Sequence, residues 1–157
     1  MWPQAANNLA QPEFQKKQKD FEDFYAESRG RRRGKRSSKV DYLSRHGEVV
    51  DALYEWRRQK GLAPGQRLVK NVLIDLGCAS GGALAEVFEV KTSATRSDLY
   101  AGIGQLLVHG TQGECLRALV LPYDEAVPPD VLSALTRLNI ALLRFELSAT
   151  AAFIRAQ

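Results

Sequence analysis

The alternation of helix-like and strand-like segments after residue 40 is the feature that most constrains the fold of this 157-residue chain. Residues 42–60 have apolar side chains at helical spacing and precede Gly61 and Pro64-Gly65, so we predict an amphipathic helix that ends there. The apolar positions on its shared face are Val49, Ala52, Leu53 and Trp56. Residues 66–76 are strand-like, and the apolar run Val72-Leu73-Ile74 is typical of a strand buried on both faces.

The rest of the chain continues the alternation. The turn sequence Ser80-Gly81-Gly82 predicts that residues 84–92 return antiparallel as a hairpin. Ser97-Asp98 can cap a second helix that continues to His109, with an apolar side formed by Leu99, Ile103, Leu106 and Leu107. A strand over 116–121, a helix from Pro128 to about residue 138 and a strand over 140–147 follow. This order predicts a three-layer α/β domain around a small mixed sheet.

Composition limits the class of protein. The 45% hydrophobic and 25% charged content is ordinary for a soluble globular domain with a buried core, and the net charge of +4 favours polyanionic partners only weakly. The chain has no apolar run long enough to span a membrane and no signal-peptide pattern, so we expect a cytoplasmic protein with no membrane partner. Cys78 and Cys115 lack zinc-site spacing and are expected to be reduced core thiols.

Residues 1–40 are expected to form an arm ahead of a domain over residues 41–157. Residues 1–14 show no periodicity, and residues 15–28 are compatible with a charged helix. The stretch that follows combines Gly and Ser with a run of positive charges: Arg31, Arg32, Arg33, Lys35 and Arg36. Such a run is either a solvated linker or a basic arm that binds nucleic-acid phosphates without sequence choice.

An acidic and a basic residue stand two positions apart in an apolar, strand-like run. Strand alternation places Glu89 and Lys91 on one face of a sheet, whereas Phe88 and Val90 point to the other. Asp75 lies in the strand-like stretch upstream, where an unpaired carboxylate would be costly. We expect the three charged residues to form a site for a divalent cation and a phosphodiester. The alternative is an exposed Glu–Lys pair with an Asp at a strand end.

These residues resemble a known family of nucleases. Asp75, then Glu89-x-Lys91 after a hairpin, and then a helix that carries Gln105 are similar to the PD-(D/E)XK nuclease superfamily. The run 88–92 (FEVKT) followed by 100–107 (YAGIGQLL) is especially similar to bacterial members, and the resemblance covers roughly residues 41–147. It implies the restriction-endonuclease-like fold, a three-layer α/β/α arrangement with a small mixed central sheet.

The resemblance also implies an activity, the hydrolysis of phosphodiester bonds in DNA with Mg2+, or Mn2+ in its place. Mg2+ binds through one or two carboxylates, waters and phosphate oxygens, and Asp75 and Glu89 could supply the carboxylates. Lys91 could orient the attacking water or stabilise negative charge in the transition state. In the family, the residue at the position of Gln105 belongs to the site beside the Glu89–Lys91 pair. Such an enzyme would act in restriction, repair or defence against mobile elements.

Further candidates come from the same comparison. Family members often place a Glu near the start of the first helix, which favours Glu48 as a third metal ligand over a residue of a solvated helix face. His46 could contact a phosphate or support the metal site, or it could be a surface residue. Many members carry a Tyr four residues after the Gln, where this chain has His109. This departure puts the usual aromatic contact in doubt and leaves His109 as a polar one. Thr92 could donate a hydrogen bond to a phosphate.

Two classes of function remain open from the sequence. The first is the nuclease, and the second is a non-catalytic nucleic-acid-binding or assembly module that keeps the fold and no longer cuts. The complete Asp, Glu, Lys and Gln set favours the nuclease. DNA is preferred to RNA on family grounds only. Many relatives dimerise, and the short chain with its basic arm is compatible with a homodimer or a larger assembly.

Overall fold

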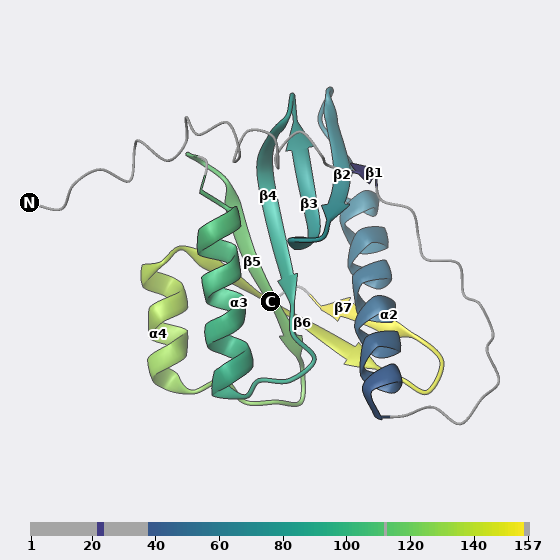
Figure 1. The fold of residues 1–157 in the computed structure, drawn as a ribbon, viewed down its shortest axis with the longest axis vertical. Coiled ribbons are helices and arrows are strands. Elements are labelled where there is room, and N and C mark those ends of the chain that lie inside the picture. Colours follow the sequence, from purple (N-terminus) through teal and green to yellow (C-terminus); the bar gives the residue numbers. More distant parts are fainter. Residues whose placement is uncertain (1–21, 24–37, 112, 156–157) are drawn as a thin grey trace, which may run out of the picture.

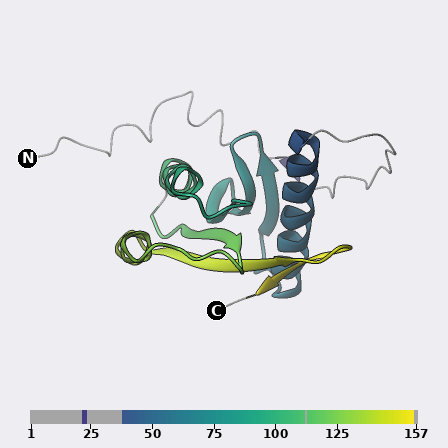
Figure 2. The ribbon, with the colours of Figure 1, turned by 90° about the horizontal axis from the view of Figure 1, so that it is seen from below.

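A mixed β-sheet with helices on both faces forms the body of the molecule (Figures 1 and 2). The computed structural model describes residues 22–23, 38–111 and 113–155, with side chains from residue 45 onward. The seven strands are hydrogen-bonded in chain order, from β1 to β7. The predicted α/β class is confirmed.

The order of elements places a meander before the parallel part of the sheet. Strands β2, β3 and β4 are antiparallel neighbours, β5 and β6 continue parallel to β4, and the short β1 and β7 pair antiparallel at the two edges. The strands are β1 (Glu22–Asp23), β2 (Gln66–Asn71), β3 (Ile74–Ser80), β4 (Ala83–Val90), β5 (Leu116–Pro122), β6 (Ile140–Leu147) and β7 (Ala152–Arg155). The helices among the described residues are α2 (Ser38–Gln59), α3 (Arg96–His109) and α4 (Pro129–Arg137).

Two hydrophobic cores lie on the two faces of the sheet. The first packs α3 and α4 against the sheet through buried residues that include Val87, Leu99, Leu106, Leu119 and Leu135. The second packs α2 against the other face through residues that include Val49, Leu53, Phe88, Val90 and Phe145. Because successive strand residues alternate between faces, Phe88 and Val90 face α2, while Val87 and Glu89 face α3. The predicted alternation in β4 is therefore confirmed.

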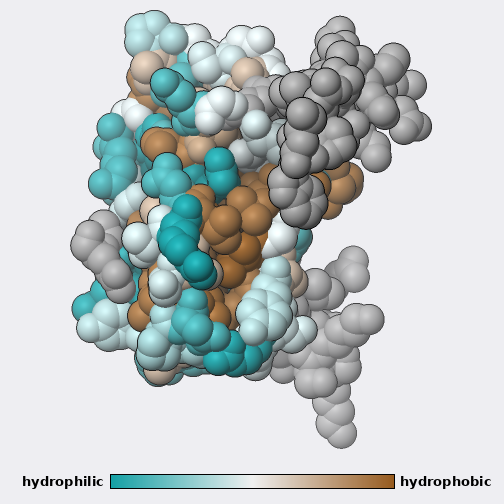
Figure 3. All heavy atoms as spheres, turned by 90° about the vertical axis from the view of Figure 1, so that its left-hand side faces the viewer, coloured by the Kyte–Doolittle hydropathy of each residue, from teal (hydrophilic) through white to brown (hydrophobic). Residues whose placement is uncertain are grey.

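The α3 and α4 side of the molecule keeps part of its apolar surface exposed. Ile103 and Leu107 of α3 and Leu138 after α4 are only partly buried against the first core. Figure 3 shows hydrophobic side chains at the surface on this side of the molecule.

Most predicted elements occur close to where the sequence places them. The helix predicted for residues 42–60 is α2, and β5, α4 and β6 each begin and end within a residue or so of the prediction. The hairpin at Gly81 and Gly82 is confirmed, and both glycines have positive φ angles of 59° and 90°. The start of α3 is a correction, since Thr95 rather than Ser97 or Asp98 is its N-cap and accepts a hydrogen bond from the Asp98 backbone N–H.

The continuous strand predicted for residues 66–76 is wrong. The chain turns between β2 and β3, where the Asn71 side-chain oxygen accepts hydrogen bonds from the backbone N–H groups of Leu73 (2.7 Å) and Ile74 (3.1 Å). Val72, expected in a buried strand, is 100% exposed at the tip of this turn. Asn forms such turns through its own side chain, and here this outweighs the β propensity of the apolar residues beside it.

Predictions at the two ends of the chain have mixed outcomes. Glu22 and Asp23 pair with Lys70 and Val69 in the sheet, so the helix predicted over residues 15–28 is wrong at these two positions. The other residues before Ser38, which include Arg31, Arg32, Arg33, Lys35 and Arg36, lie outside the described residues. The segment after residue 148 carried no predicted element but contains β7.

Two further expectations concern the whole described part of the chain. No helix within it is long and apolar enough to cross a membrane. Cys78 and Cys115 are free and buried, as predicted.

Candidate active site

Asp75 and Glu89 lie next to each other at one end of the β3–β4 pair. Leu76 pairs with Phe88 and Gly77 with Val87, and the same register continued by one residue sets Asp75 opposite Glu89. Residues opposite each other in an antiparallel pair have Cβ atoms about 5 Å apart on the same face. The Val90 N–H donates a hydrogen bond of 2.8 Å to Asp75 Oδ2, which fixes one carboxylate against the neighbouring strand. Two acidic groups are thus held side by side.

Lys91 joins this acidic pair to helix α3. Its ammonium donates hydrogen bonds to Glu89 Oε1 at 2.7 Å and to Gln105 Oε1 at 2.6 Å. Its backbone N–H donates to the Val120 carbonyl, which holds the end of β4 against β5. The Lys91 and Glu89 side chains are only 14% and 5% exposed. The structure therefore brings Glu89, Lys91 and Gln105, three predicted site residues, into one hydrogen-bonded chain.

Helix α2 reaches the same cluster from the other face of the sheet. His46 Nε2 lies 3.3 Å from Asp75 Oδ2, and the two side chains are 27% and 20% exposed. The hydrogen bond to Asp75 raises the pKa of His46, burial opposes this, and the negative charges of Asp75 and Glu89 add to the rise. His46, predicted as a contact of the site, is in direct contact with one of its carboxylates.

The carboxyl group of Glu89 has a strongly perturbed pKa. Its pKa is raised from 4.5 to about 7, first by burial and then by the negative charge of Asp75, while the contact with Lys91 opposes both. Like charges at close range cannot both ionise freely in a partly buried site. A cation bound between the two carboxylates would offset their repulsion and favour the ionised form of Glu89.

Gly102 allows α3 to lie close to Lys91 and β5, and the sequence analysis did not identify it. A Cβ atom added there would lie 2.6 Å from Leu119 Cδ1 and 3.4 Å from both Cγ and Cε of Lys91. Helix α3 packs this closely on β5 because position 102 has no side chain, and the stem of Lys91 lies along the space it leaves. A glycine inside a helix otherwise costs about 1 kcal/mol relative to alanine, and that cost was the signal that could have identified it.

None of the hydrogen bonds that join the cluster among the described residues involves the other predicted residues. Glu48 is exposed and lies two residues after His46 on α2, about 200° around the helix from it. His109 is one turn beyond Gln105, about 6 Å further along α3, and burial lowers its pKa. The Thr92 hydroxyl is buried and has no hydrogen-bond partner among the described residues. The predicted arginines and lysine of the basic arm lie outside those residues.

The donor set fits a hard cation with few protein ligands. Asp75 Oδ2 and Glu89 Oε1 are occupied by the hydrogen bonds above, and none described for residues 45–155 uses Asp75 Oδ1 or Glu89 Oε2. Each carboxylate thus has one oxygen left for a ligand. The described residues contain no group of three or more His, Cys, Asp or Glu side chains that could hold a metal ion. Mg2+ commonly binds through one or two carboxylates and completes its shell with waters and phosphate oxygens, so two protein ligands suffice.

The family resemblance rests on the order and placement of Asp75, Glu89, Lys91 and Gln105. Comparisons of the chain with protein-family models, with curated proteins and with solved structures found no match.

Proposed function

We propose that this protein is a metal-dependent nuclease that hydrolyses phosphodiester bonds of DNA, in restriction, repair or defence against mobile elements. The observation that carries the proposal is the cluster in which Asp75, Glu89, Lys91 and Gln105 meet. The restriction-endonuclease-like fold belongs to the same proposal. The order of α2, the antiparallel β2–β4, α3 and the parallel β5 supports it.

Hydrolysis of a phosphodiester requires neutralisation of the phosphate charge and a water positioned for in-line attack. The free oxygens of Asp75 and Glu89 would hold Mg2+ or Mn2+. When bound, such an ion polarises the phosphate oxygens and lowers the pKa of a coordinated water. The protein contributes by holding the two carboxylates in register from adjacent strands.

In this proposal Lys91 acts on the phosphate or on the attacking water. An ammonium group has three N–H donors, and two of those of Lys91 are used by Glu89 and Gln105. The third remains for an oxygen of the substrate or of the water. Gln105 fixes the ammonium from the α3 side, so the direction of the remaining donor is set by two different elements.

His46 has a supporting role in this arrangement. Its ring and the Val90 N–H both contact Asp75 Oδ2, so the carboxylate is held at two points and its Oδ1 is directed elsewhere. Groups that orient a ligand in this way commonly change metal affinity by about 10-fold to 100-fold when removed. His46 thereby connects α2 to the chemistry of β3 and β4.

The proposal is tested by cleavage of plasmid and short labelled duplexes, with Mg2+ or Mn2+ and with a chelator. We expect cleavage to require the metal. Asp75→Ala, Glu89→Ala and Lys91→Ala should each lower the rate by about 10²-fold or more, the scale of losing one charge-stabilising group in an active site. The matched control is Arg58→Ala, because Arg58 is exposed on α2 and pairs only with Glu55 among the described residues.

Two results would contradict the proposal. Cleavage by Lys91→Ala at the wild-type rate would show that the mechanism is wrong. Binding to DNA that weakens steeply with salt, with no metal-dependent cleavage of any substrate, would instead favour a non-catalytic nucleic-acid-binding module. Circular dichroism of each variant separates loss of chemistry from loss of folding.

A further inference from the structure

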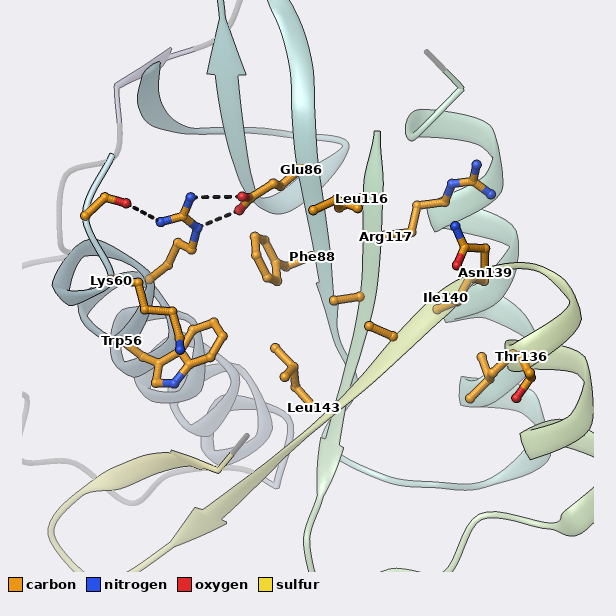
Figure 4. A pocket seen from close by; sticks show the side chains of 15 residues that line it. Trp56, Lys60, Glu86, Phe88, Leu116, Arg117, Thr136, Asn139, Ile140 and Leu143 are labelled. Carbon is orange, nitrogen blue, oxygen red and sulfur yellow. Dashed lines mark hydrogen bonds and ion pairs between the residues drawn. The ribbon is translucent and has the colours of Figure 1, made fainter. Parts of the chain in front are cut away.

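A hollow lies on the face of the sheet opposite the acidic cluster, between the end of α2, the end of α4 and strands β4 to β6 (Figure 4). Its volume is about 580 Å³. Sites for small organic molecules usually occupy about 300–1,000 Å³ and are mostly apolar with a few polar groups. The side chains of Phe88, Leu143 and Trp56 point toward one another around this hollow. It is therefore of the right size and surface chemistry for a small molecule.

The hollow exists because the helices leave part of this face open. Helix α2 packs on β3, β4 and β7, and beside the beginnings of β5 and β6 helix α4 contributes Leu135 and Thr136 to the lining. Leu116, the first residue of β5, is 63% exposed, and Ala141 on β6 is exposed as well. The concave shape and the volume favour a small ligand.

The charges around the hollow do not balance. Arg57 donates two hydrogen bonds to the Glu86 carboxylate, at 2.6 Å and 2.9 Å, so these two charges neutralise each other. Lys60 has no carboxylate partner among the described residues, and its ammonium lies 4.6 Å from the centre of the Trp56 ring. Arg117 also lines the hollow, but its side chain points away from Phe88, Trp56 and Leu143 (Figure 4), and its guanidinium donates a hydrogen bond of 3.3 Å to the Leu138 carbonyl. The positive charge left without a carboxylate at the rim is that of Lys60.

We propose that this hollow binds an apolar organic anion. A ring or chain of the ligand would pack against Phe88, Leu143 and Trp56, and one carboxylate, sulfonate or phosphate group would pair with Lys60. An uncharged ligand would fill the same space but leave the ammonium without an anion. This site does not depend on the proposed nuclease activity, because it lies on the other face of the sheet and shares no residue with the acidic cluster.

Trp56 gives a direct optical test. The chain has two tryptophans, so in a Trp2→Phe background Trp56 is the sole indole donor. The probe is anilinonaphthalene sulfonate, an apolar aromatic anion, and its matched control is phenylnaphthylamine, which has the same rings without the sulfonate. We expect saturable binding of one sulfonate probe per chain with energy transfer from Trp56, and weaker binding of the uncharged probe. A cooperative thermal transition measured with the probe present shows that the folded protein binds it.

Substitutions in the hollow locate the binding. Lys60→Ala should weaken binding of the sulfonate probe by about two- to fivefold, the range of an exposed ion pair, and leave the uncharged probe unaffected. Ala141→Phe should fill the hollow from an exposed position and abolish binding of both probes. The control Arg58→Ala should change neither. Asp75→Ala should bind both probes like the wild type, so a failed nuclease assay would not affect this test.

Three outcomes would overturn the proposal. One is the absence of energy transfer from Trp56 at saturating probe. Another is equal binding of both probes that Lys60→Ala does not change. The last is a dimer in sedimentation equilibrium that Ala141→Phe converts to a monomer, because a second copy of the chain would then cover the hollow.

Discussion

Glu89 has the most buried side chain among the charged residues and His46 of the cluster. It faces α3, is nearly buried, and shares its surroundings with Asp75 on one side and Lys91 on the other. Burial and the Asp75 charge raise its pKa to about 7, so without a bound cation it is only partly ionised at neutral pH. A divalent ion would shift that balance toward the carboxylate, which is the form that binds metal.

The raised pKa has a consequence for stability. The folded state binds the Glu89 proton more tightly than the unfolded state, whose ordinary pKa is 4.5. The stabilisation is therefore fully present below that value and is lost as the pH rises through about 7. Glu89→Gln imitates the protonated form. We expect its free energy of unfolding in urea to exceed that of the wild type at about pH 8, with a difference that shrinks toward about pH 4. A variant less stable than the wild type at the higher pH would contradict this.

The buried hydroxyl of Thr92 allows a test of stability by a substitution that removes this one group. Its buried hydroxyl has no partner among the described residues, and such a group costs about 1–3 kcal/mol. Thr92→Val removes the hydroxyl and keeps the branched shape. We expect the free energy of unfolding to rise by about 1 kcal/mol, measured by urea titration without DNA or metal. A decrease would show that the hydroxyl has a partner in the folded protein.

Local spacing determines how much of the site could be predicted. Glu89 and Lys91 are two residues apart in a strand, so their common face follows from alternation. Gln105 could be placed beside them only through the family resemblance, because its contact with Lys91 spans 14 residues. The contact of His46 with Asp75 spans 29 residues and joins a helix to a strand, so no sequence pattern specifies it. The burial of the Thr92 hydroxyl likewise depends on packing from other elements.

At the level of elements, the distance between α3 and β5 controls the site. Gly102→Ala would place a Cβ atom 2.6 Å from Leu119 Cδ1, so either the fully buried Leu119 side chain must repack or α3, which carries Gln105, must shift. We expect the free energy of unfolding to fall by about 1–3 kcal/mol, although alanine is the better helix former, and the cleavage rate to fall as well.

The matched control for this substitution lies on the same helix. Gly104 has no atom within 4 Å of an added Cβ. Gly104→Ala should therefore raise the free energy of unfolding by up to about 1 kcal/mol and leave cleavage unchanged. If both alanine variants had equal stability in urea titrations, the close packing at position 102 would be refuted.

The elements that could be predicted are those with local start and stop signals. Helix α4 begins at Pro129, directly after its N-cap Pro128, and the β3–β4 hairpin forms at two glycines with positive φ angles. The turn after Asn71 was missed because Val72-Leu73-Ile74 has the composition of a buried strand, and composition cannot show that a side chain of Asn caps the turn. Strand β7 has alternating half-buried and exposed residues, too short a pattern to stand out.

At the scale of the whole molecule, the two proposed sites lie on the two faces of one sheet. The acidic cluster gathers at one end of β3 and β4, where α2 and α3 both reach it. The proposed anion pocket lies on the α2 face beside β5 and β6. The α/β class could be predicted because the strands are neighbours in chain order and adjacent segments pair with each other. The open part of the α2 face could not be predicted from the sequence, because it depends on how far one helix extends over a twisted sheet.

Binding of Mn2+ to the purified chain, followed through the electron paramagnetic resonance signal of the free ion, tests the acidic cluster most directly. The control is Asp130→Asn, because Asp130 is an exposed acid that pairs with Arg96 away from the cluster. We expect one bound ion per chain in the wild type and in this control, and its loss in Asp75→Ala and in Glu89→Ala. Equal binding by all four proteins, or no binding by the wild type, would contradict a metal site formed by Asp75 and Glu89.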